Sequence, residues 1–225
     1  MPADIEAQHV EINSRAELRN WLMKNHRQKE SIWLVNYKKP DVRNVAYDDI
    51  VEEALCFGWV DSLPRVLDER RSMLRLSPRK PKSAWSAVNK LRVEKLTAAG
   101  LMQTAGLAIV KTAKATGTWD KLNDVEALQM PADLAISLEK NKLAKGYFEL
   151  FPRSVKRAIL EWILNAKKPE TRTARIAETI SKAEKNIRAN QWRQRKVEAS
   201  SKTTSPAATM IAPAGPSGGS SFSLK

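Results

Sequence analysis

The spacing of apolar residues changes near residue 81, and this change limits the folds that the chain can adopt. In the segment SIWLVNYKK, Ile32 and Leu34 point to one side of a strand, while Trp33 and Val35 point to the other. A strand with two apolar faces is typical of the interior of a sheet. After the run from Pro78 to Pro81 the spacing becomes helical. The sequence therefore predicts an α+β fold, with a small N-terminal antiparallel sheet and helices, followed by a mainly helical C-terminal part.

Local signals place the first elements. Ser14 and Glu17 have the spacing of a capping box, which predicts a helix beginning at Ser14. The segment YDDIVEEALCFGW predicts a second helix, ended by Gly58. The segments LPRVL and SMLRLS flank a polar run at 68–71 and predict a β-hairpin. Its inward-facing residues are expected to be Val66, Leu74 and Leu76.

The rest of the ordered chain is expected to be helical. Ser83 is a plausible N-cap for the first of these helices. The expected helices span residues 83–99, 106–116, 131–144, 153–167 and 171–190.

The chain divides into two ordered parts and a tail. We expect an α+β part at residues 1–95 and a helical part at 96–192 packed on it, either as a separate domain or within the same one. Of the 27 residues from Ala199 to Lys225, 21 are Ala, Ser, Thr, Pro or Gly. So few apolar residues cannot offset the entropy of ordering, and we expect a disordered tail at 193–225.

Charge and composition narrow the classes of partner. Lys and Arg total 39 against 25 acidic residues, and the formal net charge is +14. Residues 65–95 hold 10 basic and 3 acidic residues, and residues 151–196 hold 13 and 4. Two basic blocks on a near-neutral body indicate an attraction to polyanions.

Several classes of site and location are disfavoured by the sequence. One Cys and two His give no cysteine- or histidine-based metal site, and we expect no metal and no cofactor. No stretch approaches the apolar length of a membrane span. The segment MPADIEAQHVEINS carries acids and no apolar core of a secretory signal, so we expect a cytoplasmic protein.

The string FGWVDS at 57–62 is the first candidate for chemistry. Trp59 offers an apolar or stacking surface, and Asp61 and Ser62 offer polar anchors for a ligand. The alternative interpretation is a helix C-cap with a core tryptophan and side chains that bond the local backbone.

The string PRKPKSAWSAVN is the second candidate. A basic loop with Arg79 leads to a helix whose N-terminus, at Ser83, can bind an anion. Trp85 and Asn89 are four residues apart and are expected to share a face of that helix. The alternative interpretation is a solvated loop with an ordinary helix cap.

The string AKKPETRTARI is the third candidate, with Arg172 and Arg175 one turn apart. Its plainer interpretation is a helix–helix turn with a surface ion pair. The chain contains no nucleophile elbow, no phosphate-binding loop and no dinucleotide-binding fingerprint, so the sequence assigns no reaction.

Six strings carry a resemblance to a known family. They are NWLMKNH, IWLVNYKKP, ALCFGWVDS, PRKPKSAWSAVN, AGLMQTAGLAIVKTAKATGTW and AKKPETRTARI. Together they resemble the bacteriocin-protection family, also called YdeI/OmpD-associated, over roughly residues 10–190. The resemblance implies a link to tolerance of bacteriocins or antimicrobial peptides and association with an outer-membrane porin. It implies no catalytic residue, but the family pattern falls on the three candidate strings.

Two functions of different class follow. The first hypothesis is a cytoplasmic module that binds a small anionic ligand in an aromatic and basic pocket. The residues expected to contact this ligand are Trp59, Asp61, Ser62, Arg79, Ser83, Trp85, Asn89 and Arg172. The alternative is a nucleic-acid or polyanion binding protein that acts through the basic blocks. A direct role at the envelope is harder to explain, because a chain of net charge +14 repels cationic peptides.

Overall fold

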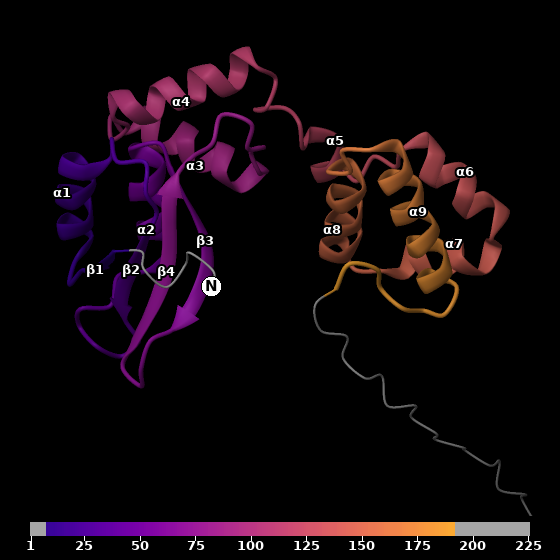
Figure 1. Cartoon of the computed structure of the whole chain (residues 1–225), viewed down its shortest axis with the longest axis horizontal. Coiled ribbons are helices and arrows are strands. Elements are labelled where there is room, and N and C mark those ends of the chain that lie inside the picture. The colour runs from indigo at the N-terminus through magenta and orange to yellow at the C-terminus, as the bar shows by residue number, and fades with distance from the viewer. Residues whose placement is uncertain (1–7, 192–225) are drawn as a thin grey trace, which may run out of the picture. The chain divides into compact units, whose positions relative to one another are not determined.

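Strand β2, Ile32–Tyr37, lies in the interior of a four-stranded sheet, as its two apolar faces predict. The computed structural model describes residues 8–191 (Figure 1). All six residues of β2 are buried, and the strand order is β1-β2-β4-β3. The other strands are β1 (His9–Glu11), β3 (Trp59–Val66) and β4 (Arg71–Pro78).

The predicted hairpin is confirmed as β3 and β4, and a short strand joins the sheet at its other side. Strand β1 pairs in parallel with β2, so the sheet is mixed rather than purely antiparallel. Strand β3 contains a bulge between Asp61, which pairs with Leu76, and Pro64, which pairs with Leu74. Val66 was expected to face the core, but it is 74% exposed because it lies at the hairpin end, where it pairs with Ser72.

Four helices complete the first part of the chain. They are α1 (Arg15–Asn25), α2 (Tyr47–Cys56), α3 (Ala87–Ala98) and α4 (Thr104–Ala115). The Ser14 side chain accepts a hydrogen bond from the Glu17 N–H and caps α1, as predicted. Gly58 ends the turn after α2 with φ +76°, a conformation that favours glycine. Gly106 lets α4 approach α2, because a Cβ there would lie 2.3 Å from the Cys56 carbonyl oxygen.

The predicted start of α3 is wrong. The helix begins at Ala87, and the hydroxyl of Ser86, not that of Ser83, accepts the capping bond from the Asn89 N–H. Residues 80–86 are a loop that includes Pro81, and this loop carries Trp85 in front of the helix. Trp85 and Asn89 are therefore not a helical pair.

The second part of the chain is helical. Its helices are α5 (Asn123–Glu126), α6 (Ala132–Lys140), α7 (Lys142–Leu150), α8 (Arg153–Leu164) and α9 (Pro169–Ala183). The single helix predicted at 131–144 is wrong, because the chain breaks at Asn141 and starts a new helix there. The Asn141 side chain accepts a hydrogen bond from the Ala144 N–H and caps α7.

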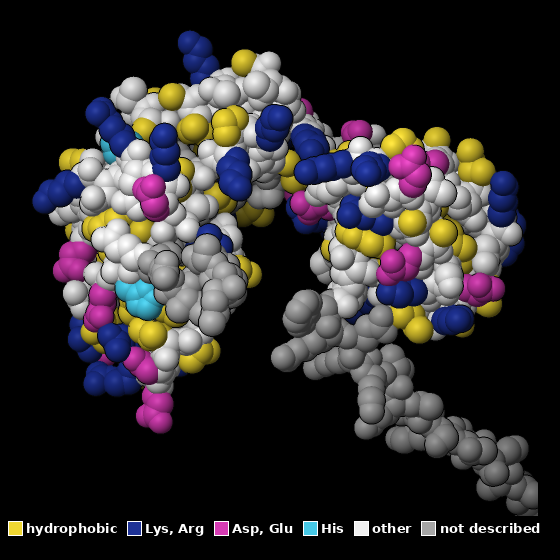
Figure 2. All heavy atoms as spheres, in the orientation of Figure 1, with side chains coloured by type: hydrophobic (Ala, Val, Ile, Leu, Met, Phe, Trp, Pro, Cys, Tyr) yellow, Lys and Arg dark blue, Asp and Glu magenta, His cyan; other side chains and the backbone are white. Residues whose placement is uncertain are grey.

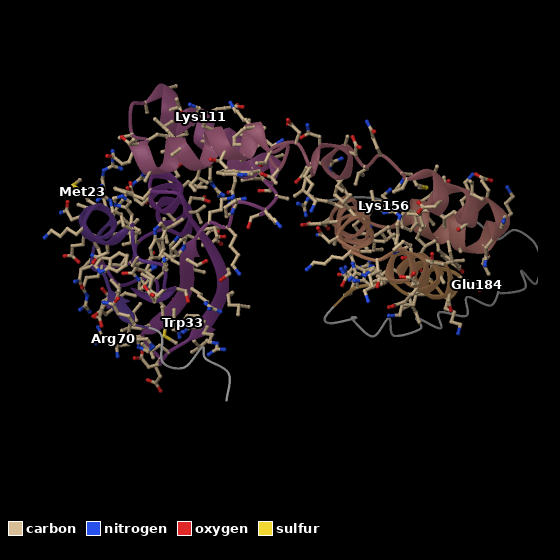
Figure 3. The ribbon with its side chains drawn as sticks, turned by 45° about the horizontal axis from the view of Figure 1, so that its top comes forward. Met23, Trp33, Arg70, Lys111, Lys156 and Glu184 are labelled. Carbon is tan, nitrogen blue, oxygen red and sulfur yellow. The ribbon has the colours of Figure 1, made fainter. Side chains whose placement is uncertain are left out.

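Two separate clusters of buried apolar residues form the core. The first runs from Val10 to Trp119 and the second from Leu122 to Ala189. We call residues 8–119 the sheet part and residues 122–189 the helical bundle. Trp33 lies inside the sheet part, whereas Met23 and Lys111 lie at its surface (Figure 3). The predicted α+β class is confirmed, and the predicted tail at 193–225 lies outside the described residues.

Candidate ligand-binding site

A cavity of about 690 Å³ lies between the first turn of α2 and the inner face of the sheet near the hairpin end. Buried apolar side chains form part of its wall, namely Val45, Ile50 and Leu74. The polar residues Ser62 and Ser72 also line it. A volume of this size and a mixed apolar and polar lining are typical of small-molecule sites.

Asn36 fixes the chain segment that leads into α2 at the edge of this cavity. The buried side-chain amide of Asn36 donates to the Val45 carbonyl at 2.8 Å and accepts from the Val45 N–H at 3.0 Å. Both functions of the amide are therefore satisfied by one backbone unit. This pair holds the first turn of α2, and with it Tyr47, against strand β2.

Tyr47 and Asp61 meet at the cavity. The Tyr47 hydroxyl donates to Asp61 Oδ2 at 2.6 Å, and both side chains line the cavity. Partial burial and this hydrogen bond raise the pKa of Tyr47 to about 12, so the hydroxyl stays a proton donor at neutral pH. The bulge of β3 lies next to this pair, and bulges often re-aim side chains near sites.

Helix α3 reaches the same region through Arg92. The Arg92 guanidinium donates to Asn89 Oδ1 at 2.9 Å and pairs with Asp48, which lines the cavity. The charge of Arg92 acts on Tyr47 in the direction that lowers its pKa. Asn89 is thus connected to the cavity through Arg92. The sequence did not single out Tyr47 or Arg92, and only the three-residue spacing of Asn89 and Arg92 on a helix could have suggested the latter.

Arg79 is the most unusual side chain of the sheet part. It is 6% exposed, and its Nε and Nη1 atoms are buried without a hydrogen-bond partner in the described chain. Its Nη2 donates to the Ala84 carbonyl at 2.5 Å, and its guanidinium carbon lies 3.7 Å from the ring centroid of Trp85. Burial lowers the pKa of Arg79 to about 10, against the opposing charge of Asp61, so the group remains a cation at neutral pH.

The two tryptophans of the predicted site are buried. The ring centroids of Trp85 and Trp119 lie 5.0 Å apart with their planes tilted by 44°, and Lys90 and Lys114 lie within 5.5 Å of the Trp119 ring centroid. Trp59 is fully buried, and its Nε1 donates to the His26 carbonyl at 3.0 Å. Trp85 also contacts the Arg79 guanidinium through its ring and so helps to hold Arg79 in place. Trp59, in contrast, has the surroundings of a core residue.

The predicted site residues separate into groups. Asp61 and Ser62 line the cavity, and Asn89 is connected to it by Arg92. Arg79 and Trp85 form a stacked pair. Ser83 lies in the loop of residues 80–86, where its N–H donates to the Lys80 carbonyl.

Arg172, the last predicted site residue, has its partners inside the helical bundle. Its Nε donates to Asp133 Oδ2 at 2.6 Å and its Nη2 to Asp133 Oδ1 at 2.9 Å, which joins α9 to α6. The bidentate pair raises the pKa of Arg172 and lowers that of Asp133. This geometry corresponds to the surface ion pair that was the plainer interpretation.

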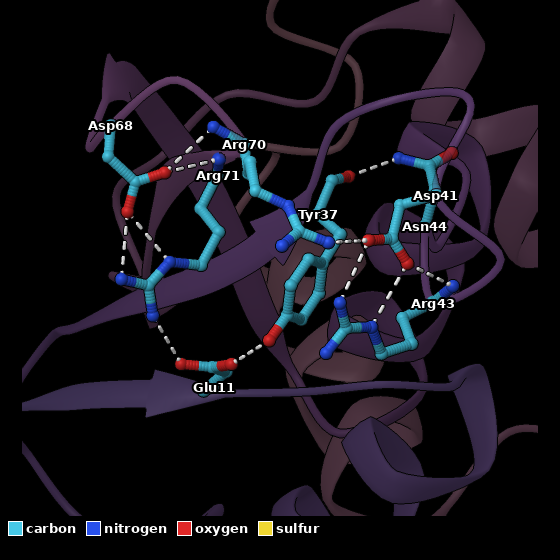
Figure 4. Close-up of polar contacts among 8 residues, drawn as sticks. All are labelled: Glu11, Tyr37, Asp41, Arg43, Asn44, Asp68, Arg70 and Arg71. Carbon is cyan, nitrogen blue, oxygen red and sulfur yellow. Dashed lines mark hydrogen bonds and ion pairs between the residues drawn. The ribbon is translucent and has the colours of Figure 1, made fainter.

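A network of three arginines and three carboxylates ties the hairpin end to the segment after β2 (Figure 4). Arg43 donates two bonds to Asp41 and lies 3.7 Å from the Tyr37 ring centroid. Arg71 bridges Asp68 and Glu11 at 2.8 Å each. The hydrogen bonds that Arg43 donates to Asp41 hold the pKa of Asp41 far below its usual range. Because each carboxylate has an arginine partner, the network supports the fold rather than offering a site.

Other classes of site find little support in residues 8–191. That range holds no group of three or more His, Cys, Asp or Glu side chains placed to hold a metal ion. None of its helices is long and apolar enough to span a membrane. Cys56 is buried, and burial raises the pKa of its thiol, which disfavours the reactive thiolate.

Comparison with known proteins separates the two parts of the chain. No curated protein and no solved structure matches it. Residues 10–109, within the sheet part, match a family model described as a domain of unknown function (DUF8412). The resemblance drawn over residues 10–190 is confirmed for a segment of the helical bundle. Residues 127–186 match the family described as Bacteriocin-protection, YdeI or OmpD-Associated, so this segment of the chain is similar to that family.

Proposed function

We propose that the sheet part binds a small ligand through an anionic group at Arg79. The observation that carries this proposal is the pair of buried, unpartnered nitrogen atoms of the Arg79 guanidinium. Buried polar groups are almost always hydrogen-bonded, and a buried charge without a partner is costly. A carboxylate or phosphate group would supply both the acceptor oxygens and the countercharge.

The surroundings of Arg79 support a preorganised binding group. The Trp85 ring fixes the guanidinium from one face, and the Ala84 carbonyl accepts from Nη2. These contacts hold the side chain while Nε and Nη1 keep their donors unused. A donor that is already oriented loses little entropy when the ligand arrives.

Because Arg79 is buried, binding of a ligand to it requires a local change of structure. Because Nε and Nη1 are shielded from solvent, a ligand reaches them only after a local movement. The loop of residues 80–86 follows Arg79 directly and supplies the Ala84 acceptor. We expect this loop, or the Asp61 side chain, to move during binding.

A thermal-shift screen tests the proposal. Inorganic phosphate, citrate and nucleoside monophosphates are added to the wild-type chain, to Arg79→Met and to Arg70→Met, the last removing an arginine that is exposed. At 100 times Kd, binding stabilises by about 2.7 kcal/mol, which corresponds to roughly 5–10 °C for a chain of this size. We expect one class of anion to stabilise the wild type and Arg70→Met, but not Arg79→Met. The proposal fails if each anion shifts all three proteins equally.

The same variants distinguish the alternative of polyanion binding. On the face shown in Figure 2, basic side chains lie mixed with acidic and apolar ones. A polyanion bound to such a surface would lose affinity steeply with salt, and Arg70→Met would weaken it as much as Arg79→Met. Binding of random DNA and RNA at two salt concentrations measures this directly.

The cellular role follows as part of the proposal. The match of residues 127–186 connects the chain with bacteriocin protection by family description. A chain of net charge +14 repels cationic peptides, so we place the protein in the cytoplasm with an indirect role in tolerance. Fractionation of native cells tests this location, and recovery with the periplasm or outer membrane would contradict it.

A further inference from the structure

We infer that the ligand carries a hydroxyl or ammonium group next to its anionic group, and an apolar body that occupies the cavity beside Asp61. This inference rests on the proposed function and specifies the class of ligand. Three observations carry it: the position of Asp61, the unused capacity of its carboxylate, and the lining of the cavity.

Asp61 lines the cavity, whereas Arg79 is not one of the lining residues, so Asp61 is the residue that relates the two. Its side chain lines the cavity, and its backbone pairs with Leu76 in the register that places Pro78 opposite Trp59. Arg79 follows Pro78, and its N–H donates to the Gly58 carbonyl at 2.9 Å. The charge of Asp61 also acts on the Arg79 guanidinium. A ligand that occupies the cavity and extends to Arg79 therefore lies within the influence of this carboxylate.

The Asp61 carboxylate retains an unused acceptor. Within residues 8–191, the one side-chain hydrogen bond that this carboxylate accepts comes from the Tyr47 hydroxyl on Oδ2, and no Lys or Arg of that range forms a salt bridge with it. A ligand with only anionic oxygens would be repelled by this carboxylate. A hydroxyl or ammonium group beside the anion would donate to Asp61 and remove that repulsion. The unused donors of Arg79 and the unused acceptor of Asp61 thus require complementary groups on one end of the ligand.

The cavity accommodates the rest of the ligand. Its buried lining of Val45, Ile50 and Leu74 is apolar, and the Tyr47 side chain is 54% exposed at its edge. A volume of about 690 Å³ exceeds what an anion and one donor would fill. A flat apolar or aromatic body would bury this lining and pack against the Tyr47 ring.

Three matched probes test the inference by isothermal titration calorimetry. The probes 3-phenylpropionate, 3-phenyllactate and phenylalanine share a carboxylate and a phenyl ring, and they differ in having no donor, a hydroxyl or an ammonium group at the neighbouring carbon. We expect at least one of the two donor probes to bind the wild-type chain about tenfold or more tightly than 3-phenylpropionate. The stronger of the two identifies the donor.

Variants assign each part of the ligand to its residue. In Asp61→Ala the preference for the donor probe should disappear, while Tyr47→Phe, which keeps the carboxylate, should retain it. Ser62→Trp narrows the cavity from an exposed strand position. It should weaken all three phenyl probes and leave inorganic phosphate unaffected.

The outcomes separate this inference from the proposed function. Equal affinities for the three probes, or phosphate binding that depends on Arg79 without any binding of the phenyl probes, would overturn the inference and leave the proposed function intact. If neither phosphate nor any probe binds in a way that depends on Arg79, the proposed function fails and the inference fails with it.

Discussion

The sheet part and the helical bundle bury different kinds of side chain. Among the described residues, the buried polar or charged ones of the sheet part are Asn36, Glu52, Glu53 and Arg79. The bundle buries one, Thr179, whose hydroxyl donates to the Arg175 carbonyl within the same helix. The bundle keeps its ion pairs at partly exposed positions, as between Lys182 and Glu178.

Burial of charge in the sheet part takes two forms. Glu53 is 2% exposed, but Arg15 donates to one of its oxygens at 2.7 Å and Arg19 to the other at 2.8 Å. Arg79 is buried to a similar degree and has two nitrogen atoms without a partner. Only the second form demands a further group, so the lack of a partner, rather than burial, marks the candidate site.

The largest expected effect tests whether the two cores are independent. Phe148 is 1% exposed in the core of the bundle, and Phe148→Ala should cost about 4 kcal/mol through lost contacts and a cavity. Because the apolar clusters are separate, amide hydrogen exchange should lose protection in α6–α9 and keep it in β2 and β4. A uniform loss of protection would show that the two parts unfold together.

The next effect compares buried and exposed carboxylates. Glu53→Ala leaves two arginines without their shared acceptor and should lower the free energy of unfolding by about 3 kcal/mol. Glu178→Ala removes an exposed pair on α9 and should cost about 0.5 kcal/mol or less. Urea unfolding followed by circular dichroism measures both. Equal losses of unfolding free energy in Glu53→Ala and Glu178→Ala would show that the buried carboxylate of the sheet part contributes no more to stability than the exposed one of the bundle.

Much of the fold could be predicted because local signals agreed with the tertiary structure. The capping box at Ser14, the two-faced strand β2 and the glycine after α2 each have a local cause. The break at Asn141 was missed because no Pro or Gly marks it, and the signal is only the side chain of Asn141, which caps α7. Strand β1 was missed because three residues give no period, and its pairing with β2 is a long-range contact.

The candidate site could be predicted only in part. Asp61 and Ser62 stood out because polar groups beside aromatic residues are unusual in a plain connection, and Arg79 stood out because it lies in a basic loop that leads into a helix. The pairing of Tyr47 with Asp61 depends on how α2 packs on β3, which no local pattern encodes. The missing partners of Arg79 are a property of packing as well, and the sequence suggested a solvated loop equally well.

A smaller effect of opposite sign contrasts two arginines. Arg79→Met removes a buried, incompletely paired cation, and we expect the free energy of unfolding to stay constant or rise by up to about 1 kcal/mol. Arg172→Met breaks the pair with Asp133 and should lower it by about 0.5 kcal/mol. Thermal and urea unfolding without ligand measure both. A loss above about 2 kcal/mol in Arg79→Met would mean that the guanidinium is structural.

The smallest effect concerns the pH dependence of the Tyr47–Asp61 pair. The folded pKa of Tyr47, about 12, lies above its value of about 10 in the unfolded chain, first because of burial and then because of the bond to Asp61. The unfolded chain loses this proton first, so the contribution of Tyr47 to stability is complete below pH 10 and is lost as the pH rises through 12.

The titration can be read from tyrosinate absorbance as the difference between the wild-type chain and Tyr47→Phe. Asp61→Ala removes the hydrogen bond and the nearby charge but leaves the burial. Its midpoint should therefore fall below that of the wild type and stay above 10. A wild-type midpoint near 10 would show that the Tyr47 hydroxyl does not donate to Asp61 in solution. In that case the Asp61 carboxylate would be fully open at the cavity, and Tyr47→Phe would no longer serve as the matched control for the donor probes.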